Sequence, residues 1–342
     1  MQPDLKIRIP KNRLTQVTRE FSGKRVAIVG DLMVDRYYWG SVTRVSPEAP
    51  VPVVDVTSES VRLGGAANVA NNVQSLGGDA LIVGLAGDDH VGDILSHLIK
   101  QQGLDSAGIV VDAGRRTTVK TRVIANDQHV VRIDYETKAP CKELAERRII
   151  EVIRERIENL DAVILEDYNK GVMTRNVIAQ VIGIAREHGK SVLVDPKFEN
   201  FFEYKNVTLF KPNRRETEEV LGGRIRTPED LHAAGKRMLQ ELKAENVLLT
   251  RGEEGMSLFE SDGSVTHLKT TARHVKDVSG AGDTVIATLA MALAAGAAMR
   301  EAAILANEAG GVVVGSVGIE PITVEQLVEA STRSGNENSR GS

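Results

Sequence analysis

The sequence is poor in cysteine, in aromatic residues and in long apolar runs. Its single cysteine, Cys141, excludes an internal disulfide. The Ala-rich stretch at residues 285–298 is far shorter than the roughly 20 residues that cross a bilayer, so we expect a buried helix there. Because no basic stretch followed by an apolar run opens the sequence, the expected location is cytoplasmic.

The sequence also lacks a large excess of charge of either sign. It has 43 lysines and arginines against 47 aspartates and glutamates, which gives a net charge of -4. Such a chain has no long-range attraction for nucleic acid or an anionic membrane, so we expect neither as a partner. The seven histidines show no paired metal-ligand spacing, which argues against a transition-metal site. Small molecules are the expected ligands.

What the sequence does contain is enough apolar material for one large α/β domain. It has 342 residues, of which 42% are hydrophobic. Strand-like runs alternate with stretches of helical periodicity, which predicts a parallel sheet with helices on both faces. These runs lie at residues 25–30, 79–84, 161–166, 191–195, 207–210 and 246–250. Polar residues follow several of them, and ligands of such sheets bind beyond the carboxyl ends of the strands.

Two segments depart from this pattern and predict a small separate sheet. Residues 51–62 and 117–135 alternate apolar and polar side chains, and Asn126 with Asp127 supplies a hairpin turn. Such a sheet is suited to cover the active site as a lid, or to form a homodimer through its apolar face. We therefore expect a domain over residues 21–330, with loosely ordered ends at 1–20 and 331–342.

The segment at residues 277–284 carries the strongest indication of chemistry. It places Gly280, Ala281 and Gly282 directly before Asp283, at the start of an apolar helix. Unobstructed backbone N–H groups at a helix N-terminus bind anions and can stabilise a γ-phosphoryl group in transfer. Asp283 would then accept the proton of the attacking hydroxyl. Alternatively, Asp283 only caps the helix and the glycines only form a turn.

Asn213 and Glu216 lie within one helical turn after the predicted strand at 207–210. An amide and a carboxylate on one face suit a hydrated Mg²⁺, which they would bind through water. The same pair also fits a helix capping box, with Asn213 as N-cap and Glu216 at the third position. The sequence leaves both interpretations open.

A second glycine-containing segment follows the strand at 246–250. Thr250, Gly252 and Gly255 would cradle the phosphates or the ribose of a nucleotide. The alternative is a simple turn between two strands.

Short polar side chains beside glycines suggest a sugar pocket near the front of the sequence. Asp31, Asp35 and Asn68 can bind sugar hydroxyls, and Gly64 and Gly65 allow close approach. These residues also fit caps and turns.

Further polar and basic residues are candidates for contacting the substrate or a phosphate. Asp167 follows the strand at 161–166. The basic candidates are Lys170, Lys197, Arg44, Arg115, Arg116 and Arg122.

Residues 63–73 with 84–92, and residues 277–290, resemble the two signatures of the PfkB carbohydrate kinases. This resemblance implies a ribokinase-like, doubly wound, mostly parallel sheet with a β lid. It implies ATP with Mg²⁺ as cofactors, Asp283 as base and residues 280–282 as the anion hole. It also implies a monovalent cation such as K⁺ near Asp277 and residues 315–318. The implied cofactor-binding residues are Asn213, Arg214, Arg215, Glu216, Thr250, Gly252, Gly255 and, near adenine, Asn307.

Residues 45–54, 167–171, 211–216 and 250–256 are similar to the D-glycero-β-D-manno-heptose-7-phosphate kinases of this family. That similarity implies phosphorylation of the anomeric hydroxyl of the heptose, in the synthesis of ADP-heptose and the lipopolysaccharide core. Many such kinases are fused to a nucleotidyltransferase, which the sequence lacks, so we expect that activity in a separate protein. Ribokinases also carry a lysine within the Gly-Gly segment, and this chain does not; Lys170 or Lys197 would take its place.

Two other functions stay open. Another PfkB kinase, acting on a fructose phosphate or a nucleoside, would use the same anion hole and base. A non-catalytic sugar-phosphate sensor could keep Asp31 and Asn68, but it would have no need of Asp283 beside the glycine loop. A dinucleotide-dependent oxidoreductase is excluded, because the first strand is not followed by a Gly-x-Gly-x-x-Gly turn.

Overall fold

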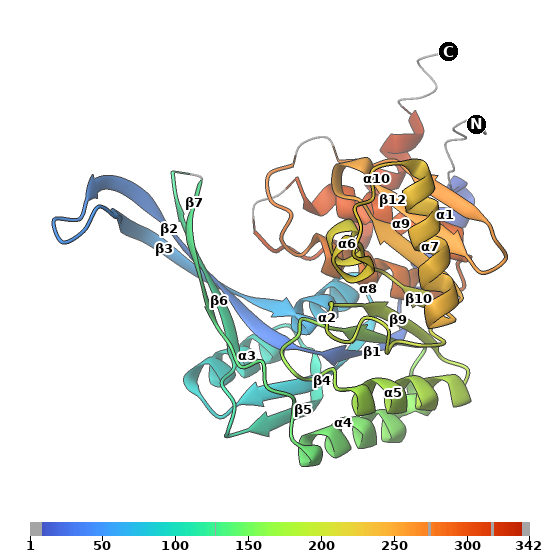
Figure 1. Cartoon of the computed structure of the whole chain (residues 1–342), viewed down its shortest axis with the longest axis horizontal. Coiled ribbons are helices and arrows are strands. Elements are labelled where there is room, and N and C mark those ends of the chain that lie inside the picture. The colour runs from blue at the N-terminus through green and yellow to red at the C-terminus, as the bar shows by residue number, and fades with distance from the viewer. Residues whose placement is uncertain (1–8, 127, 273–274, 316–317, 337–342) are drawn as a thin grey trace.

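The computed structural model describes residues 9–126, 128–272, 275–315 and 318–336, and nine strands form its central sheet. They are β1 (Arg25–Gly30), β4 (Asp79–Gly87), β5 (Asp105–Asp112), β8 (Ala162–Glu166), β9 (Ser191–Asp195), β10 (Leu209–Phe210), β11 (Asn246–Thr250), β12 (Met256–Glu260) and β13 (Val265–Leu268). Their order is β13-β12-β11-β10-β9-β8-β1-β4-β5 (Figure 1). All neighbouring pairs are parallel except β11 with β12 and β12 with β13. The predicted parallel sheet is confirmed, although the strand expected at 207–210 is shortened to β10.

Helices cover both faces of this sheet because its strands are apolar on both sides. In β1, Val26 and Ile28 belong to one core cluster, whereas Ala27 and Val29 belong to the other, as the period of a strand requires. Helices α2 (Ala66–Ser75), α3 (His90–Gln101), α8 (Ala281–Ala294) and α9 (Met299–Val313) contribute to the first cluster. Helices α4 (Glu143–Arg156), α5 (Arg175–Glu187), α6 (Arg214–Leu221) and α7 (Pro228–Leu242) contribute to the second.

A separate four-stranded sheet, which we call the lid, extends away from the central sheet (Figure 1). Its strands are β2 (Leu32–Val45), β3 (Pro52–Gly65), β6 (Thr118–Ala125) and β7 (Gln128–Tyr135), in the order β3-β2-β6-β7. The predicted segments correspond to β3, β6 and β7, and β2 is the strand that the sequence did not indicate. At the expected hairpin turn, Asn126 has a φ of 50°, whereas Asp127 lies outside the described residues.

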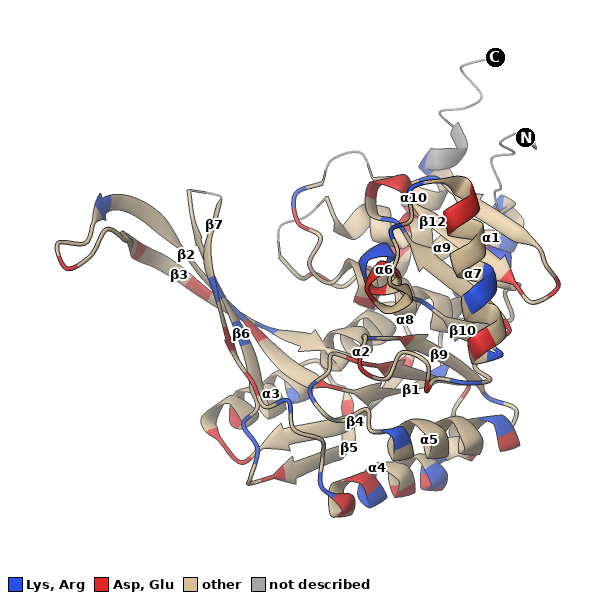
Figure 2. Ribbon diagram, in the orientation of Figure 1, with Lys and Arg blue, Asp and Glu red and all other residues tan. Residues whose placement is uncertain are grey.

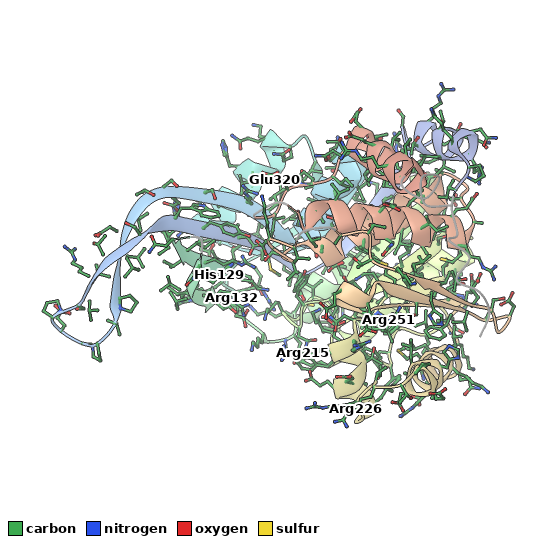
Figure 3. All side chains as sticks on the ribbon, turned by 90° about the horizontal axis from the view of Figure 1, so that it is seen from above. His129, Arg132, Arg215, Arg226, Arg251 and Glu320 are labelled. Atoms are coloured by element: carbon green, nitrogen blue, oxygen red, sulfur yellow. The ribbon has the colours of Figure 1, made fainter. Side chains whose placement is uncertain are left out.

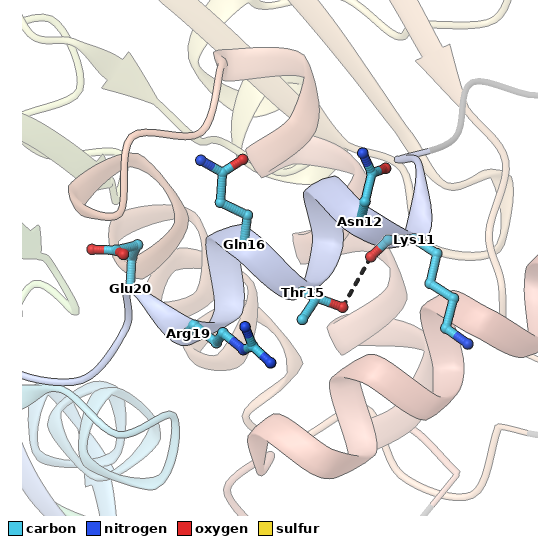
Figure 4. Close-up of a pocket in the computed structure, with 6 residues that line it drawn as sticks. All are labelled: Lys11, Asn12, Thr15, Gln16, Arg19 and Glu20. Carbon is cyan, nitrogen blue, oxygen red and sulfur yellow. Dashed lines mark hydrogen bonds between the residues drawn. The ribbon is translucent and has the colours of Figure 1, made fainter.

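The segment before residue 20 is more regular than predicted. Residues Lys11–Arg19 form helix α1, whose Leu14 and Val17 are buried in the core. Its outer face is polar, and for this reason the sequence predicted a loosely ordered segment there. That face lines a surface hollow (Figure 4), where the Thr15 hydroxyl donates to the Lys11 carbonyl. The hollow involves one face of a single helix, far along the chain from the candidate site residues, and we assign it no function.

The other end of the chain also differs from the prediction. Helix α10 (Val324–Asn336) continues past residue 331, where loose structure was expected, and its Leu327 is buried in the core. The expectation of a loose segment from residue 331 is therefore wrong as far as residue 336.

The surface shows the balance of charge that the composition predicts. Acidic and basic side chains are mixed along α4 (Figure 2), where Arg147 pairs with Glu143 and Arg148 pairs with Glu151. Across the described part of the chain, no helix has the length and apolar character required to cross a membrane.

Candidate active site

The candidate site lies where the start of α8 meets the carboxyl ends of the central strands. Glu166 is the last residue of β8 and Asp195 is the last residue of β9. Both strands run parallel to β1, so their ends lie at the same edge of the sheet. Asp283 approaches this edge from the first turn of α8. Three carboxylates from distant parts of the sequence are therefore brought together.

Asp283 is held in a fixed position by two side chains. The Asn68 amide donates to Oδ2 of Asp283 at 2.7 Å, and the Tyr168 hydroxyl donates to Oδ1 at 2.8 Å. Burial raises the pKa of Asp283 to about 6, although both hydrogen bonds oppose this change. A carboxylate of that pKa is a stronger base than an ordinary aspartate and is still ionised near neutral pH.

The start of α8 has the backbone geometry of an anion site. Gly280 is the N-cap residue and has a φ of 75°, which favours glycine. The N–H groups of Gly282 and Asp283 lie in the first turn of α8. The carbonyl groups four residues before them are outside the helix, so these N–H groups have no acceptor within it. The N–H of Ala281, in contrast, donates to the Val278 carbonyl at 3.3 Å. Among the residues predicted for the anion hole, the N–H of Ala281 is therefore already engaged, whereas that of Gly282 has no partner within the helix.

Glu166, Asp195 and Asp283 form a cluster of buried carboxylates. One oxygen from each lies within 4.8 Å of the others, and no other such cluster occurs in the described ranges. The Lys211 ammonium lies 2.7 Å from Asp195, which stabilises one of the charges. Burial, reinforced by the two neighbouring aspartates, raises the pKa of Glu166 well above its usual range.

This cluster can accommodate a divalent cation. Oε2 of Glu166 is buried and has no hydrogen-bond partner among the described residues. Hard carboxylate oxygens are the donors that Mg²⁺ prefers. The polar ends of the predicted strands, Glu166 and Asp195 among them, were expected to converge on one crevice, but the sequence did not single out these two as candidate cation ligands.

The other expected Mg²⁺ residues form the capping box that the sequence allowed as the alternative. The Asn213 side chain accepts from the Glu216 N–H, and the Glu216 carboxylate accepts from the Asn213 N–H, both at 2.9 Å. Glu216 also pairs with Lys197. Both side chains are thus engaged in the capping box, and their predicted contact with Mg²⁺ through water stays a prediction.

The expected nucleotide-binding residues are brought together at the end of β11. The backbone of Thr250 bonds to Pro212, directly before the start of α6. Gly252 and Gly255 both have positive φ, at 61° and 85°. A Cβ at Gly255 would lie 2.0 Å from the Leu268 carbonyl oxygen, so the turn requires glycine at that position.

Three arginines lie around this end of the sheet. Arg214 and Arg251 both pair with Glu254, while Arg215 is exposed at the start of α6. Figure 3 shows Arg215 and Arg251 on the large domain, and His129 and Arg132 on β7 of the lid. The pairing with Glu254 uses Nη1 of Arg214 and both terminal nitrogens of Arg251, while Nε of each arginine has no hydrogen-bond partner among the described residues.

Asn307 lies on α9, and Asp277 lies in the loop that precedes α8. The Asn307 amide donates to the Lys269 carbonyl at 2.8 Å, and Asp277 accepts from the N–H groups of Ser279 and Gly318. Residues 316 and 317 of the predicted cation loop lie outside the described residues. The structure therefore brings Asp277 to one end of that loop, at Gly318.

On the sugar side, Asp35 of β2 lies on the lid and pairs with Arg122 of β6. A Cβ at Gly64 would lie 2.2 Å from Oδ2 of Asp35, so glycine is required for this carboxylate to fit. Gly65, with a φ of 57°, is the N-cap of α2, which positions Asn68 one turn later. Asp35, Gly64, Gly65 and Asn68 thus lie together at the junction of lid and domain.

Asp31 and Asp167 have other roles than the predicted sugar contacts. The Asp31 carboxylate accepts from the backbone N–H groups of Tyr168, Lys170 and Val172. Asp167 accepts from the Tyr204 hydroxyl and the Asn169 N–H. Both side chains are buried and shape the loop after β8, so we withdraw them from the sugar pocket.

The predicted phosphate-binding lysines are both neutralised within the chain. Lys170 lies 2.7 Å from Glu136, and Lys197 pairs with Glu216. Arg115 is buried and donates to the carbonyls of Lys170 and Ala139. None of these groups is held ready for a substrate phosphate.

Comparison with known proteins settles the family. Residues 24–325 match the family model described as pfkB family carbohydrate kinase. The chain belongs to the PfkB family. It is a phosphotransferase with an alcohol group as acceptor, and kinases of the PfkB family use ATP and Mg²⁺.

Curated relatives support the same assignment. The bifunctional protein HldE of Geobacter sulfurreducens is 45% identical over 301 residues, which cover 88% of this chain and 61% of the relative. The protein of the same name from Paramagnetospirillum magneticum is 41% identical, over 94% of this chain and 66% of the relative. This PfkB chain thus spans less than two thirds of the length of these relatives.

Solved structures confirm the ribokinase-like fold. Phosphofructokinase-2 from Escherichia coli, in complex with potassium, has a TM-score of 0.74 at 19% identity and covers 92% of this chain and all of the other. Ribokinase from Arabidopsis thaliana, complexed with ribose and ATP, has a TM-score of 0.71 at 19% identity and covers 91% and 99%. The large sheet and the lid of this PfkB kinase are therefore both features of a known fold.

Proposed function

We propose that this PfkB kinase transfers the γ-phosphoryl group of ATP to the anomeric hydroxyl of D-glycero-β-D-manno-heptose 7-phosphate. The products are heptose 1,7-bisphosphate and ADP, in the synthesis of ADP-heptose and the lipopolysaccharide core. The observation that carries the kinase function is the buried carboxylate of Asp283, held by Asn68 and Tyr168 at the start of α8. The choice of heptose rests on the identity with the HldE proteins.

In the proposed reaction, the hydroxyl oxygen attacks the γ-phosphorus and the bond from that phosphorus to the β–γ bridging oxygen breaks. The hydroxyl proton passes to Asp283, and the bridging oxygen leaves with ADP. The N–H groups of Gly282 and Asp283 stabilise the charge on the transferring phosphoryl oxygens. Since Asn68 and Tyr168 fix the carboxylate, it needs little reorganisation to meet the hydroxyl.

Mg²⁺ would be held by Glu166 and Asp195 directly, and by Asn213 and Glu216 through water. When bound, it would neutralise phosphate charge. The unpartnered Oε2 of Glu166 supports this assignment. Thr250, Gly252, Gly255, Arg214 and Arg215 are proposed for the nucleotide phosphates and ribose, with Asn307 near the adenine. A monovalent cation such as K⁺ is proposed near Asp277.

The lid supports a proposed homodimer. Every residue of β7 is exposed, and Val130, Val131, Ile133 and Tyr135 add apolar surface to it. An outer strand of this kind is stabilised when another sheet covers it. We further propose that a separate nucleotidyltransferase uses the product and that the reaction takes place in the cytoplasm.

A substrate panel tests the proposal. The measurement is ADP release with heptose 7-phosphate, fructose 6-phosphate, fructose 1-phosphate, ribose and a nucleoside. The highest kcat/KM is expected for heptose 7-phosphate. A preference for another substrate would show that the heptose is not the substrate, while the assignment of the protein as a kinase would stand. Binding of sugar phosphates without ADP release would instead favour a sugar-phosphate sensor.

A further inference from the structure

Four lysines surround the loop after β8 and the start of α8, and three of them are paired with carboxylates. Lys170 pairs with Glu136, Lys197 with Glu216 and Lys211 with Asp195. The fourth is Lys120 of β6, on the lid. Within the described ranges no carboxylate oxygen lies within 4.0 Å of its ammonium group. It is thus the one lysine of this set with a charge left for a ligand.

Lys120 is directed toward the catalytic end of the site. Its Nζ lies 4.8 Å from the centre of the Tyr168 ring, and the hydroxyl of that ring donates to Asp283. On the lid, Lys120 is the register partner of Asp35 in the parallel pair of β2 and β6. Paired residues of neighbouring strands present their side chains on the same face. Lys120 therefore shares a face with Asp35, beside the tyrosine that holds the proposed base.

Neither of the two neighbouring carboxylates forms an ion pair with Lys120, because each is paired with an arginine. Asp35 is the nearest acidic candidate, but it pairs with Arg122. Asp134, on the adjacent strand β7, is bound in a bidentate manner by Arg132. Burial lowers the pKa of Lys120, and the charges of Lys170 and Arg122 act in the same direction, whereas those of Asp35 and Asp134 oppose the change. A bound anion would offset that cost.

We propose that Lys120 binds the phosphate group of a phosphorylated sugar substrate, placing that group at the lid while the reacting hydroxyl faces Asp283. This inference rests on the proposed kinase function and adds to it the recognition of substrate phosphate. In heptose 7-phosphate the phosphate and the anomeric hydroxyl are at opposite ends of the molecule, which agrees with Lys120 and Asp283 contacting different parts of Tyr168, the ring and the hydroxyl. Lys120 is half-buried, and partial burial strengthens a charge-assisted hydrogen bond to phosphate.

The test replaces Lys120 by methionine, which keeps the aliphatic stem beside Tyr168 and removes the charge. Steady-state kinetics are measured with heptose 7-phosphate and with the same heptose lacking the phosphate. We expect Lys120→Met to raise the KM for heptose 7-phosphate between about 10- and 100-fold, since hydrogen bonds to charged groups contribute that much binding. The KM for ATP and the kinetics with the unphosphorylated heptose should stay within about twofold of wild type, because neither contact involves Lys120.

Two further variants control this result. Lys120→Arg should recover most of the affinity, because arginine also binds phosphate. Lys236→Met, on the exposed face of α7, removes an equal charge away from the site and should leave both KM values unchanged. The melting temperature of each variant shows whether it is folded.

The outcomes separate this inference from the kinase assignment. If folded Lys120→Met keeps the wild-type KM for heptose 7-phosphate, or loses affinity for both sugars equally, the role of Lys120 is wrong while the kinase function stands. If the wild-type protein phosphorylates no sugar phosphate, the proposed function fails, and the role of Lys120 fails with it.

Discussion

The two sides of the site are built in different ways. On the domain side, Asp283, Glu166 and Asp195 are almost entirely buried, and Asp283 is held by two hydrogen bonds. On the lid side, every residue of β7 is exposed. The domain thus holds its proposed catalytic groups in fixed positions, whereas the lid presents an outer strand that a partner could cover. Proton transfer and phosphoryl stabilisation depend on fixed positions, while substrate recognition is assigned to the more exposed sheet.

The domain side is tested most strongly by Asp283→Asn. The anion site remains and the proton acceptor is lost, so turnover should fall by about 10³-fold while ATP binding is retained. Steady-state kinetics and nucleotide titration measure the two effects. Glu187→Gln, at the exposed end of α5, is the matched control and should behave as wild type. Turnover within a few-fold of wild type in Asp283→Asn would remove Asp283 as the base.

Asp283→Asn should also change how the stability of the folded protein depends on pH. Burial raises the pKa of Asp283 to about 6, so the folded state binds its proton more tightly than the unfolded state does. Wild type should therefore lose stability relative to Asp283→Asn as the pH rises from about 4 to about 6, with no further change above. Melting temperatures of both proteins between about pH 4.5 and 8 measure this difference. A difference independent of pH would show that Asp283 is not desolvated.

A smaller loss is expected from Gly282→Ala. The added methyl would lie 3.4 Å from Oδ2 of Asp195 and 3.6 Å from Nζ of Lys211, which are ordinary contacts, so the fold should be kept. The methyl nevertheless occupies space beside the amides that would receive the phosphoryl group. We expect kcat to fall between about 10- and 100-fold with little change in melting temperature. Unchanged kcat would place the phosphoryl group elsewhere.

Tyr168→Phe should have a weaker effect on the rate and a clear effect on its pH dependence. The Tyr168 hydroxyl lowers the pKa of Asp283 by donating to it, so its removal should move the acid limb of kcat/KM to higher pH. At high pH we expect a loss of about 10-fold, because the carboxylate is less well positioned. A loss of rate with an unmoved acid limb would mean that Tyr168 only shapes the site.

The smallest effect on chemistry is expected on the lid. Replacement of exposed Val131 and Ile133 by threonine should weaken the proposed dimer and change kcat by less than about twofold at high protein concentration. Threonine keeps the β-branched shape that suits a strand. Sedimentation over a range of concentrations measures the association. A wild-type protein that is monomeric throughout would rule out the lid dimer.

The central sheet could be predicted because its strands are short apolar runs ending in polar residues. Strands β1, β9 and β11 begin and end where the sequence indicated. Strand β2 was not predicted, because its aromatic and charged residues do not alternate regularly. Helix α1 was missed because its sequence is mostly polar and contains only two apolar residues, Leu14 and Val17. Continuous apolar runs can therefore be recognised in the sequence, whereas elements whose apolar residues are few or irregularly spaced among polar ones cannot.

Within the site, glycines were better guides than isolated polar residues. The glycines at 280 and 282 correctly indicated where α8 starts beside Asp283. Asp31 and Asp35 look alike in the sequence, yet one is surrounded by backbone N–H groups and the other pairs with an arginine from a distant strand. Lys120 stands out only after its neighbours are found to be paired. Such distinctions depend on long-range contacts that one sequence does not reveal.

The connection between the two sheets is very short. Only Asp31 separates β1 from β2, and α2 follows β3 directly, with the Ala66 N–H donating to the Asp31 carbonyl. The Asp31 side chain meanwhile binds the backbone of Tyr168. A single aspartate therefore both connects the lid to the central sheet and binds the backbone of Tyr168, whose hydroxyl donates to Asp283. The lid and the surroundings of Asp283 thus meet at one residue, although β6 and β7 also join the lid to the domain through residues 113–117 and 136–142.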